Sequence, residues 1–161
     1  KDPKDVVACI LDRPRHGDLI AAVREAGARI VLIGDGDVAG VMATAMPETG
    51  VDIYMGTGGA PEGVLAAAAL RCIGGNIQGR LLFRNDDERG RAAKVGVEDL
   101  NRKYAITDLA SGDVIFAATG VTDGNMLQGV RRTAKYFSTE SVAMRARTGT
   151  VRWIRMQHPI K

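Results

Sequence analysis

The sequence has few cysteines, histidines and aromatic residues. Its 161 residues include two cysteines, two histidines, three Phe, three Tyr and one Trp. Cys9 and Cys72 are too few for a disulfide scaffold and form no CxxC motif, so we expect both to be buried free thiols in a reducing compartment. Because His16 and His158 are the only histidines, a Cys/His zinc site is not expected. The 20 glycines indicate tight turns and close backbone approaches instead.

Long hydrophobic runs and a large net charge are also absent. No apolar run approaches the ~18 residues of a membrane span, and a net charge of +3 is too small to indicate a nucleic-acid partner. We therefore expect neither membrane nor nucleic acid as a partner, and a cytoplasmic location. Residues 1–5 do not resemble a signal peptide and do not begin with an initiator methionine. We therefore interpret residues 1–161 as one globular domain cut from a longer chain.

Short apolar runs alternate with helical patterns in the first two-thirds of the chain. Each apolar run has strand length, and each following segment has apolar residues at helical spacing, ended by glycine or proline. This alternation predicts an α/β domain with a mostly parallel sheet. The predicted strands are 6–11, 30–33 and 51–55, and the predicted helices are 19–26, 38–46 and 61–72.

The last third changes character. Residues 86–91 are strongly charged and predict a solvated helix start or connector, and residues 114–118 predict another buried strand. Alternating apolar and polar residues then predict three successive strands, with a tight turn at Thr148-Gly149 before the last. The simplest arrangement is an antiparallel hairpin that closes the sheet. These three strands are 132–137, 141–147 and 150–157.

The first of four polar motifs places two arginines around a proline. Arg13, Pro14 and Arg15 follow the first predicted strand, where ligands of open α/β sheets bind. Two guanidiniums on a restricted backbone can bind one anion together. The alternative is a pair of solvated arginines, with Asp12 or Asp18 as a helix cap.

The second motif carries two carboxylates. Asp35 and Asp37 flank Gly36 after the second strand, and on an extended backbone they point the same way. Such a pair can bind a divalent cation or accept hydrogen bonds from vicinal sugar hydroxyls. A turn with Asp37 as N-cap of the next helix explains the pattern equally well.

The third motif, residues 56–63, is the most informative. Its glycines allow backbone N–H groups to approach a ligand, and Pro61 is suited to a helix start that would bind an anion. Glu62 lies in the first helical turn, where its carboxylate could share a magnesium or manganese ion with a bound phosphate. The motif is neither a P-loop nor the GxGxxG of dinucleotide sites. The alternative is a glycine-rich turn with a helix-stabilising Glu62.

The fourth motif, residues 120–125, follows the strand at 114–118. Thr122 and Asp123 could orient a water molecule, but we favour a structural role in which they hold the turn through side-chain to backbone hydrogen bonds.

Taken together, five segments resemble the class II fructose-1,6-bisphosphatases. They are LDRPRH, GDGDVAG, GTGGAPEGVLAAAALRC, FAATGVTDG and RTGTVRWI, in that order. The resemblance covers residues 6–158 and is closest to the cyanobacterial branch, whose members also hydrolyse sedoheptulose 1,7-bisphosphate. Family members are about twice as long, so the sequence resembles their C-terminal half, with the N-terminal metal-binding half absent.

This resemblance implies a role for each motif. Arg13 and Arg15, with Pro14 between them, would contact a substrate phosphate. Asp35 and Asp37, around Gly36, would bind sugar hydroxyls. Gly59 would meet the substrate through its backbone, and Glu62 would be a metal ligand. No catalytic residue is assigned to this half.

The implied fold is a layered α/β/α domain of the sugar-phosphatase kind. The implied reaction is hydrolysis of the 1-phosphate of the sugar bisphosphate by water activated by Mg²⁺ or Mn²⁺, within gluconeogenesis and the Calvin cycle. Glu62 alone cannot hold a metal cluster, so we expect the isolated chain to be inactive without the N-terminal half.

Two other interpretations stay open. The glycine-rich helix start could belong to a non-catalytic, regulatory module that binds a sugar phosphate or a nucleotide. The segment could also be an interaction domain whose hairpin edge builds a homo-oligomer, which we expect in any case.

Overall fold

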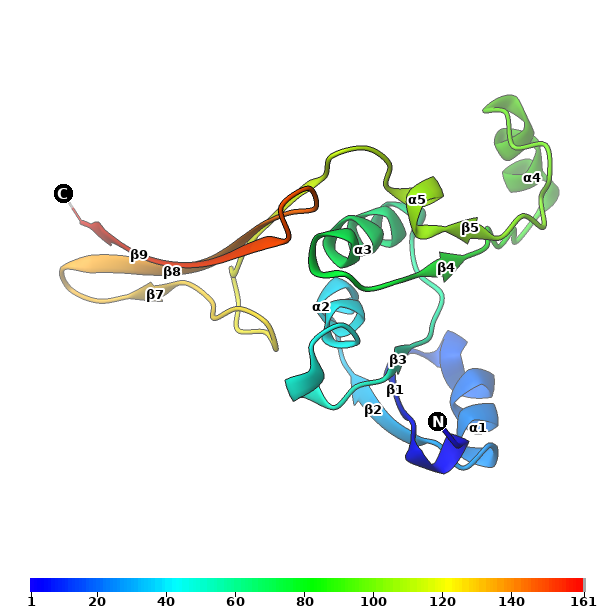
Figure 1. Ribbon diagram of the computed structural model, residues 1–161, viewed down its shortest axis with the longest axis horizontal. Coiled ribbons are helices and arrows are strands. Elements are labelled where there is room, and N and C mark those ends of the chain that lie inside the picture. Colours follow the sequence, from blue (N-terminus) through cyan, green and yellow to red (C-terminus); the bar gives the residue numbers. More distant parts are fainter. Residues whose placement is uncertain (161) are drawn as a thin grey trace.

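A parallel three-stranded sheet occupies one end of the molecule. The computed structural model describes residues 1–160, and this sheet has the order β2-β1-β3 (Figure 1). It consists of β1 (Val7–Leu11), β2 (Arg29–Ile33) and β3 (Ile53–Tyr54), followed respectively by the helices α1 (Gly17–Glu25), α2 (Asp37–Ala43) and α3 (Ala60–Ile73). The predicted strand–helix alternation is confirmed, although β3 has only two of the five residues expected.

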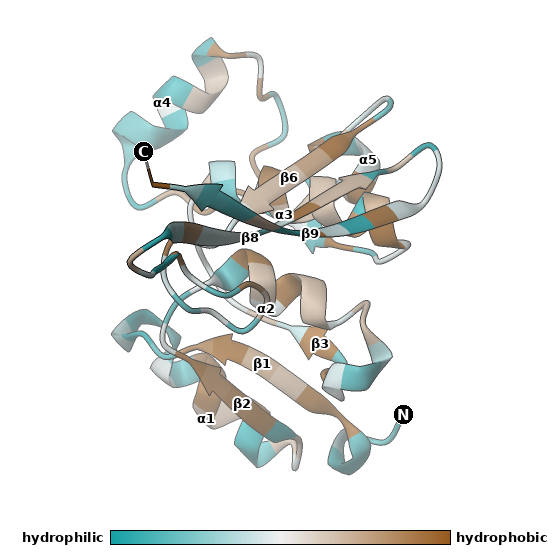
Figure 2. Ribbon diagram, turned by 90° about the vertical axis from the view of Figure 1, so that its left-hand side faces the viewer, coloured by the Kyte–Doolittle hydropathy of each residue, from teal (hydrophilic) through white to brown (hydrophobic). Residues whose placement is uncertain are grey.

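Helices cover both faces of this sheet. Ile20 and Val23 of α1 pack against Ala8 and Ile10 of β1 on one face. On the other face, α2 comes close enough that a Cβ at Gly40 would lie 2.8 Å from Ile33 Cδ1 and 3.1 Å from Tyr54 Cε2. Gly40 therefore sets the distance between α2 and the sheet. Helix α3 lies against α2, away from the parallel sheet (Figures 1 and 2).

A separate antiparallel sheet covers the far side of α3. It contains β6 (Ile115–Thr119), β7 (Arg131–Arg132), β8 (Tyr136–Arg145) and β9 (Thr150–Pro159), with β8 between the other strands. The layers are thus α1, parallel sheet, α2 with α3, and antiparallel sheet (Figure 2). The antiparallel C-terminal hairpin is confirmed, but the expectation that it closes the parallel sheet was wrong, since it forms a sheet of its own with β6.

The strand boundaries in this sheet also differ from expectation. The predicted strands 132–137 and 141–147 are replaced by short β7 and by the ten-residue β8, which pairs with β9 from Tyr136–Pro159 to Arg145–Thr150. The Thr133 hydroxyl accepts hydrogen bonds from the N–H groups of Lys135 and Tyr136 and so turns the chain there. The turn at 148–149 is confirmed, with Gly149 at φ +61°.

The remaining elements form an excursion between α3 and β6. A two-stranded ladder of β4 (Gln78–Gly79) and β5 (Tyr104–Ala105) leads to α5 (Ile106–Leu109). Of the two alternatives for residues 86–91, a helix start or a connector, the structure has a helix, α4 (Asp86–Lys94). The Asn85 side-chain oxygen caps this helix by accepting the Glu88 N–H. Single 3-10 turns cover Pro3–Asp5, Pro14–His16 and Pro47–Thr49. No helix within residues 1–160 combines the length and the apolar character needed to cross a membrane.

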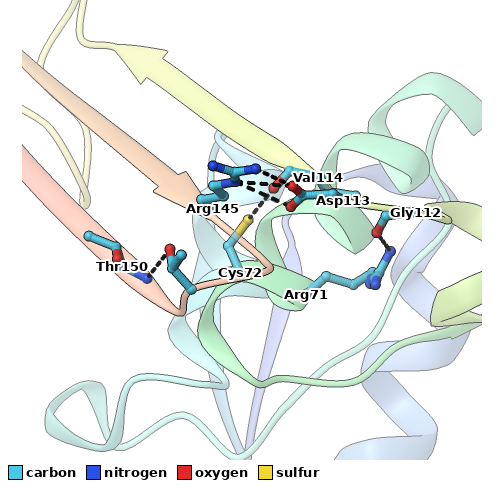
Figure 3. Close-up of polar contacts among 8 residues, drawn as sticks. Arg71, Cys72, Gly112, Asp113, Val114, Arg145 and Thr150 are labelled. Carbon is cyan, nitrogen blue, oxygen red and sulfur yellow. Dashed lines mark hydrogen bonds and ion pairs between the residues drawn. The ribbon is translucent and has the colours of Figure 1, made fainter.

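Helix α3 joins the two sheets through a buried core and polar contacts. Ala69 and Cys72 pack against Phe116, Val142 and Met144 of the antiparallel sheet. Nearby, the Arg71 guanidinium donates to the Ala110 carbonyl at 2.7 Å. It also donates to the Gly112 carbonyl at 2.7 Å, and Asp113 pairs with Arg145 (Figure 3). Cys9 and Cys72 are buried and free, as predicted, and burial raises the pKa of both thiols.

Candidate functional site

A cavity of about 820 Å³ opens where β1 and β3 end, beside the first turn of α3. Four of the residues predicted from the sequence line it: Arg15, Asp37, Gly59 and Glu62. They come from the segments that follow β1, β2 and β3, which the parallel order of the strands brings to one edge of the sheet. The cavity therefore places a guanidinium, two carboxylates and a helix N-terminus around one space.

Residues 13–16 are hydrogen-bonded to the glycine-rich loop at Thr57. Arg15 Nε donates to the Thr57 carbonyl oxygen at 2.8 Å, and the Thr57 N–H donates to His16 Nε2 at 2.9 Å. Arg15 makes no ion pair within the described residues 1–160. Because only its Nε is engaged, the terminal nitrogens of the guanidinium are left to bind an anion in the cavity.

Glu62 lies in the first turn of α3, as the sequence predicts. Gly59 is the N-cap residue and Pro61 occupies the start of the helix. A Cβ at Gly59 would overlap Glu62 Oε2 and lie 3.2 Å from Glu62 Cδ. The Glu62 carboxylate is thus folded back over the Gly59 backbone, and only glycine leaves it room there.

The second motif is divided between two cavities. Asp37 lines the large cavity, whereas Asp35 and Gly36 line a smaller one of about 460 Å³ together with residues 119–127. The expectation that the two carboxylates point the same way required an extended backbone. Gly36 has φ +72° and Asp37 already belongs to α2, so the alternation of an extended chain is broken between them. Gly36, not Asp37, is the N-cap residue.

Arg13 and Pro14 line neither of these two cavities. Arg13 Nη1 donates to the neighbouring Asp12 carbonyl at 2.9 Å. The alternative in which Asp12 or Asp18 caps the following helix is wrong: Arg13 and His16 are the cap residues there, without a side-chain cap hydrogen bond.

Asp123 of the fourth motif has the structural role favoured from the sequence. Asp123 Oδ1 accepts from the Gly129 N–H at 2.9 Å, and Asp123 pairs with Arg131 at 2.7 Å. The Arg131 guanidinium and this backbone N–H lower the pKa of Asp123. The motif follows β6 of the antiparallel sheet, yet its loop comes back to face Asp35 across the smaller cavity.

Several further residues that line the large cavity were not predicted as site residues, among them His16, Arg80, Tyr104 and Tyr54. Arg80 and Tyr104 come from the excursion that contains β4 and β5, and Tyr54 lies on β3. Burial and the nearby Asp37 raise the pKa of Tyr54 to about 12, so its hydroxyl stays protonated. Arg80 directly follows β4, which has two residues. A strand this short has no recognisable alternation of apolar and polar residues, so the sequence did not predict that Arg80 lies at this cavity.

The residues present do not complete a metal centre by themselves. Within residues 1–160 there is no group of three or more His, Cys, Asp or Glu side chains that could hold a metal ion. Mg²⁺ and Mn²⁺ are held by several oxygen ligands, so an ion bound by Glu62 would need further ligands besides it.

A cavity at the strand ends, with an arginine facing a helix N-terminus, is typical of α/β proteins that bind phosphate groups. Comparison with known proteins makes this class specific. Residues 1–158 match the family described as bacterial fructose-1,6-bisphosphatase, glpX-encoded. The chain belongs to this family.

Curated relatives agree with this assignment. The chain is 39% identical to the D-fructose 1,6-bisphosphatase class 2/sedoheptulose 1,7-bisphosphatase of Synechococcus sp. (strain JA-3-3Ab), covering 98% of the chain and 49% of the relative. It is 38% identical to the protein of the same name from Trichodesmium erythraeum (strain IMS101), covering 96% of the chain and 49% of the relative. The chain thus spans about half the length of these relatives, namely their C-terminal half.

Proposed function

We propose that the protein containing this chain hydrolyses the 1-phosphate of fructose 1,6-bisphosphate, and also acts on sedoheptulose 1,7-bisphosphate, in cytoplasmic carbohydrate metabolism. The chain supplies the loops that bind the sugar bisphosphate and one metal ligand. Family membership and the names of the relatives support this substrate class. The single observation that carries the proposal is the meeting of Arg15, Asp37, Gly59 and Glu62 at one cavity.

Each of these residues has a role that its chemistry allows. The free nitrogens of Arg15 offset the charge of a substrate phosphate and fix its position. Backbone N–H groups at the start of α3 bind the same anion. Asp37 accepts hydrogen bonds from sugar hydroxyls in the large cavity. Asp35 lines the smaller cavity, so it binds sugar hydroxyls only if the substrate extends into that cavity. Arg13 is next to Arg15 but lines neither cavity, so its contact with a substrate phosphate stays a prediction.

The proposed cofactor is Mg²⁺ or Mn²⁺, with Glu62 as one of its ligands. When bound, the ion would polarise a phosphoryl oxygen and lower the pKa of a water molecule. Glu62 is suited to the role because its carboxylate lies over Gly59, next to the N–H groups that would hold the phosphate.

Substitution of Glu62 in the full-length protein tests the catalytic proposal. Glu62→Gln keeps the size of the side chain and removes its charge, so activity should fall at least tenfold and the metal concentration needed for half-maximal activity should rise. Glu48→Gln, at an exposed glutamate outside the cavity, should change neither. A Glu62→Gln enzyme with wild-type activity and metal dependence would refute the role.

The isolated 161-residue chain should not turn over substrate. The lack of a three-ligand group within residues 1–160 supports this expectation, since a two-metal phosphatase needs several carboxylates. Assay of the chain with Mg²⁺ or Mn²⁺, alone and mixed with the N-terminal half, tests it. Turnover by the isolated chain at the rate of the full-length protein would contradict the proposal.

The same observation favours a second candidate function, a non-catalytic module that binds a sugar phosphate or a nucleotide. Under that function Glu62→Gln would leave binding of the sugar phosphate almost unchanged, and no metal dependence would exist to be lost. A homo-oligomeric state also belongs to the proposal, supported by the ten-residue β9, which within residues 1–160 pairs with β8 alone. Light scattering of the full-length protein measures that state directly.

A further inference from the structure

His16 is the one buried polar side chain found among residues 1–160. It is 1% exposed, although the neighbouring Pro14, Arg15 and Gly17 are exposed. Burial of an imidazole is favourable only when its ring nitrogens find hydrogen-bond partners. The partners of His16 therefore indicate what the side chain does.

Both ring nitrogens contact main-chain groups, one in β1 and one in the glycine-rich loop. Nδ1 lies 2.8 Å from the carbonyl oxygen of Leu11, the last residue of β1, and Nε2 lies 2.9 Å from the amide nitrogen of Thr57. A carbonyl oxygen can only accept, so Nδ1 carries the proton; an N–H can only donate, so Nε2 is the acceptor. The Thr57 carbonyl, 3.2 Å from Nε2, is instead satisfied by Arg15 Nε at 2.8 Å.

The ring also fixes the close approach of the two loops. A Cβ at Gly56 would lie 3.2 Å from His16 Cε1 and 3.3 Å from His16 Nε2, so a glycine gives the ring this space. The Thr57 N–H is thus bound by His16, and the Thr57 carbonyl is bound by Arg15. The next residues along the chain are Gly58 and Gly59, which lead into α3 and to Glu62.

We propose that His16 is a positioning residue of the sugar-bisphosphate site: by accepting the Thr57 N–H it fixes the glycine-rich loop at the distance from Arg15 at which both hold one phosphate. The inference rests on the proposed function, because it names the part that His16 plays in binding that substrate. In this role His16 acts through Thr57, because it lies at the wall of the large cavity but is only 1% exposed.

Two substitutions of similar size separate this role from simple packing. In the full-length protein, His16→Met fills the space without any hydrogen-bonding group, and leaves the Thr57 N–H and the Leu11 carbonyl without partners. His16→Gln places an amide oxygen near the position of Nε2 and can still accept the Thr57 N–H. Thermal unfolding of both variants checks that they are folded at the assay temperature.

The positioning role predicts a rise in KM for fructose 1,6-bisphosphate of at least tenfold in His16→Met, with kcat within about threefold of wild type. His16→Gln should keep KM within about threefold. If His16 only filled space, the two variants would behave alike. Wild-type KM in His16→Met, or equal loss in both variants, would overturn the inference.

A second readout separates failure of the inference from failure of the proposed function. If the wild-type protein hydrolyses neither sugar bisphosphate, the proposed function is wrong, and calorimetric titration with inorganic phosphate then decides on His16. Phosphate binding at least tenfold weaker in His16→Met than in wild type and His16→Gln supports the role. Equal binding by all three proteins, or no binding by wild type, overturns it.

Discussion

The predicted site residues of the parallel region and the charged residues of the antiparallel region differ in whether they form ion pairs. In the parallel region, the predicted site residues Arg13, Arg15, Asp35, Asp37 and Glu62 make no ion pair within residues 1–160. In the antiparallel region, three acidic residues pair with arginines across strands and turns. These pairs are Asp113–Arg145, Asp123–Arg131 and Glu140–Arg155.

The difference follows from topology. Parallel strands that are joined through helices bring all their carboxyl ends to one edge, so loops with unpaired charges gather there and can bind a ligand. Neighbouring antiparallel strands place opposite charges side by side, where they pair with each other. Charged residues that have no ion-pair partner and line one cavity therefore indicate the functional region. The number of charged residues in a region is a poorer indicator.

The largest expected effect concerns the core that joins the two regions. Met144 on β8 is 2% exposed and faces α3, whereas Met156 on β9 is 47% exposed. Met144→Ala should lower the free energy of unfolding by about 2–5 kcal/mol because it leaves a cavity, and Met156→Ala by less than about 0.5 kcal/mol. Urea denaturation of the full-length variants measures both values. Equal losses would contradict the view that the α3-facing side holds the core.

The next prediction compares arginines of the two regions. Arg15→Ala removes a guanidinium that can form charge-assisted hydrogen bonds to phosphate, each about 1.5–3 kcal/mol, so kcat/KM should fall about 10- to 100-fold. Arg152→Ala is the control, since Arg152 is exposed on β9 and has no ion pair within the described part of the chain. Steady-state kinetics of the full-length variants decides. Equal rates for Arg15→Ala and wild type would remove Arg15 from the site.

A glycine pair gives a smaller but more specific effect. Gly59→Ala should displace the Glu62 carboxylate, whose flexible end occupies the place of the new Cβ. We expect activity to fall about tenfold while the free energy of unfolding changes by less than about 1 kcal/mol, because a side-chain end can move aside without disturbing the fold. Gly90→Ala on α4, where a Cβ would meet no atom within 4 Å, should keep full activity. Unchanged activity in Gly59→Ala would argue against a role for the Glu62 position.

The smallest effect concerns pH. The Arg145 and Arg131 guanidiniums lower the pKa values of Asp113 and Asp123, and the Gln128 N–H, followed by Arg155, lowers that of Glu140. A lowered folded pKa gives stability that is complete above the unfolded pKa, about 4, and is lost as the pH falls through the folded value. The melting temperature should therefore fall slightly with acid, and less steeply in Asp113→Asn.

The control for this measurement is Asp87→Asn, at an exposed residue of α4 without an ion pair in the described residues. It should follow the wild-type melting curve at every pH. If Asp113→Asn shows the same acid dependence as wild type, the Asp113–Arg145 pair does not contribute to stability.

Local sequence determined the elements whose signals are local. Apolar runs and helix-ending glycines predicted β1, α1, β2 and α3, and the position of Glu62 in the first turn of α3 followed from Pro61 and the glycines before it. The buried thiols and the structural role of Asp123 were predicted for the same reason. Each depends on contacts with chain neighbours or on the polarity of a single segment.

Tertiary structure alone decided which residues meet. The antiparallel strands form their own sheet against α3, and the segments that follow β1, β2 and β3 meet at one cavity. His16 and Thr57 lie 41 residues apart in the chain, yet share a hydrogen bond. No local pattern encodes such pairs, because backbone groups carry no sequence signal and their partners are set by the packing of β1, β3 and α3 into one body.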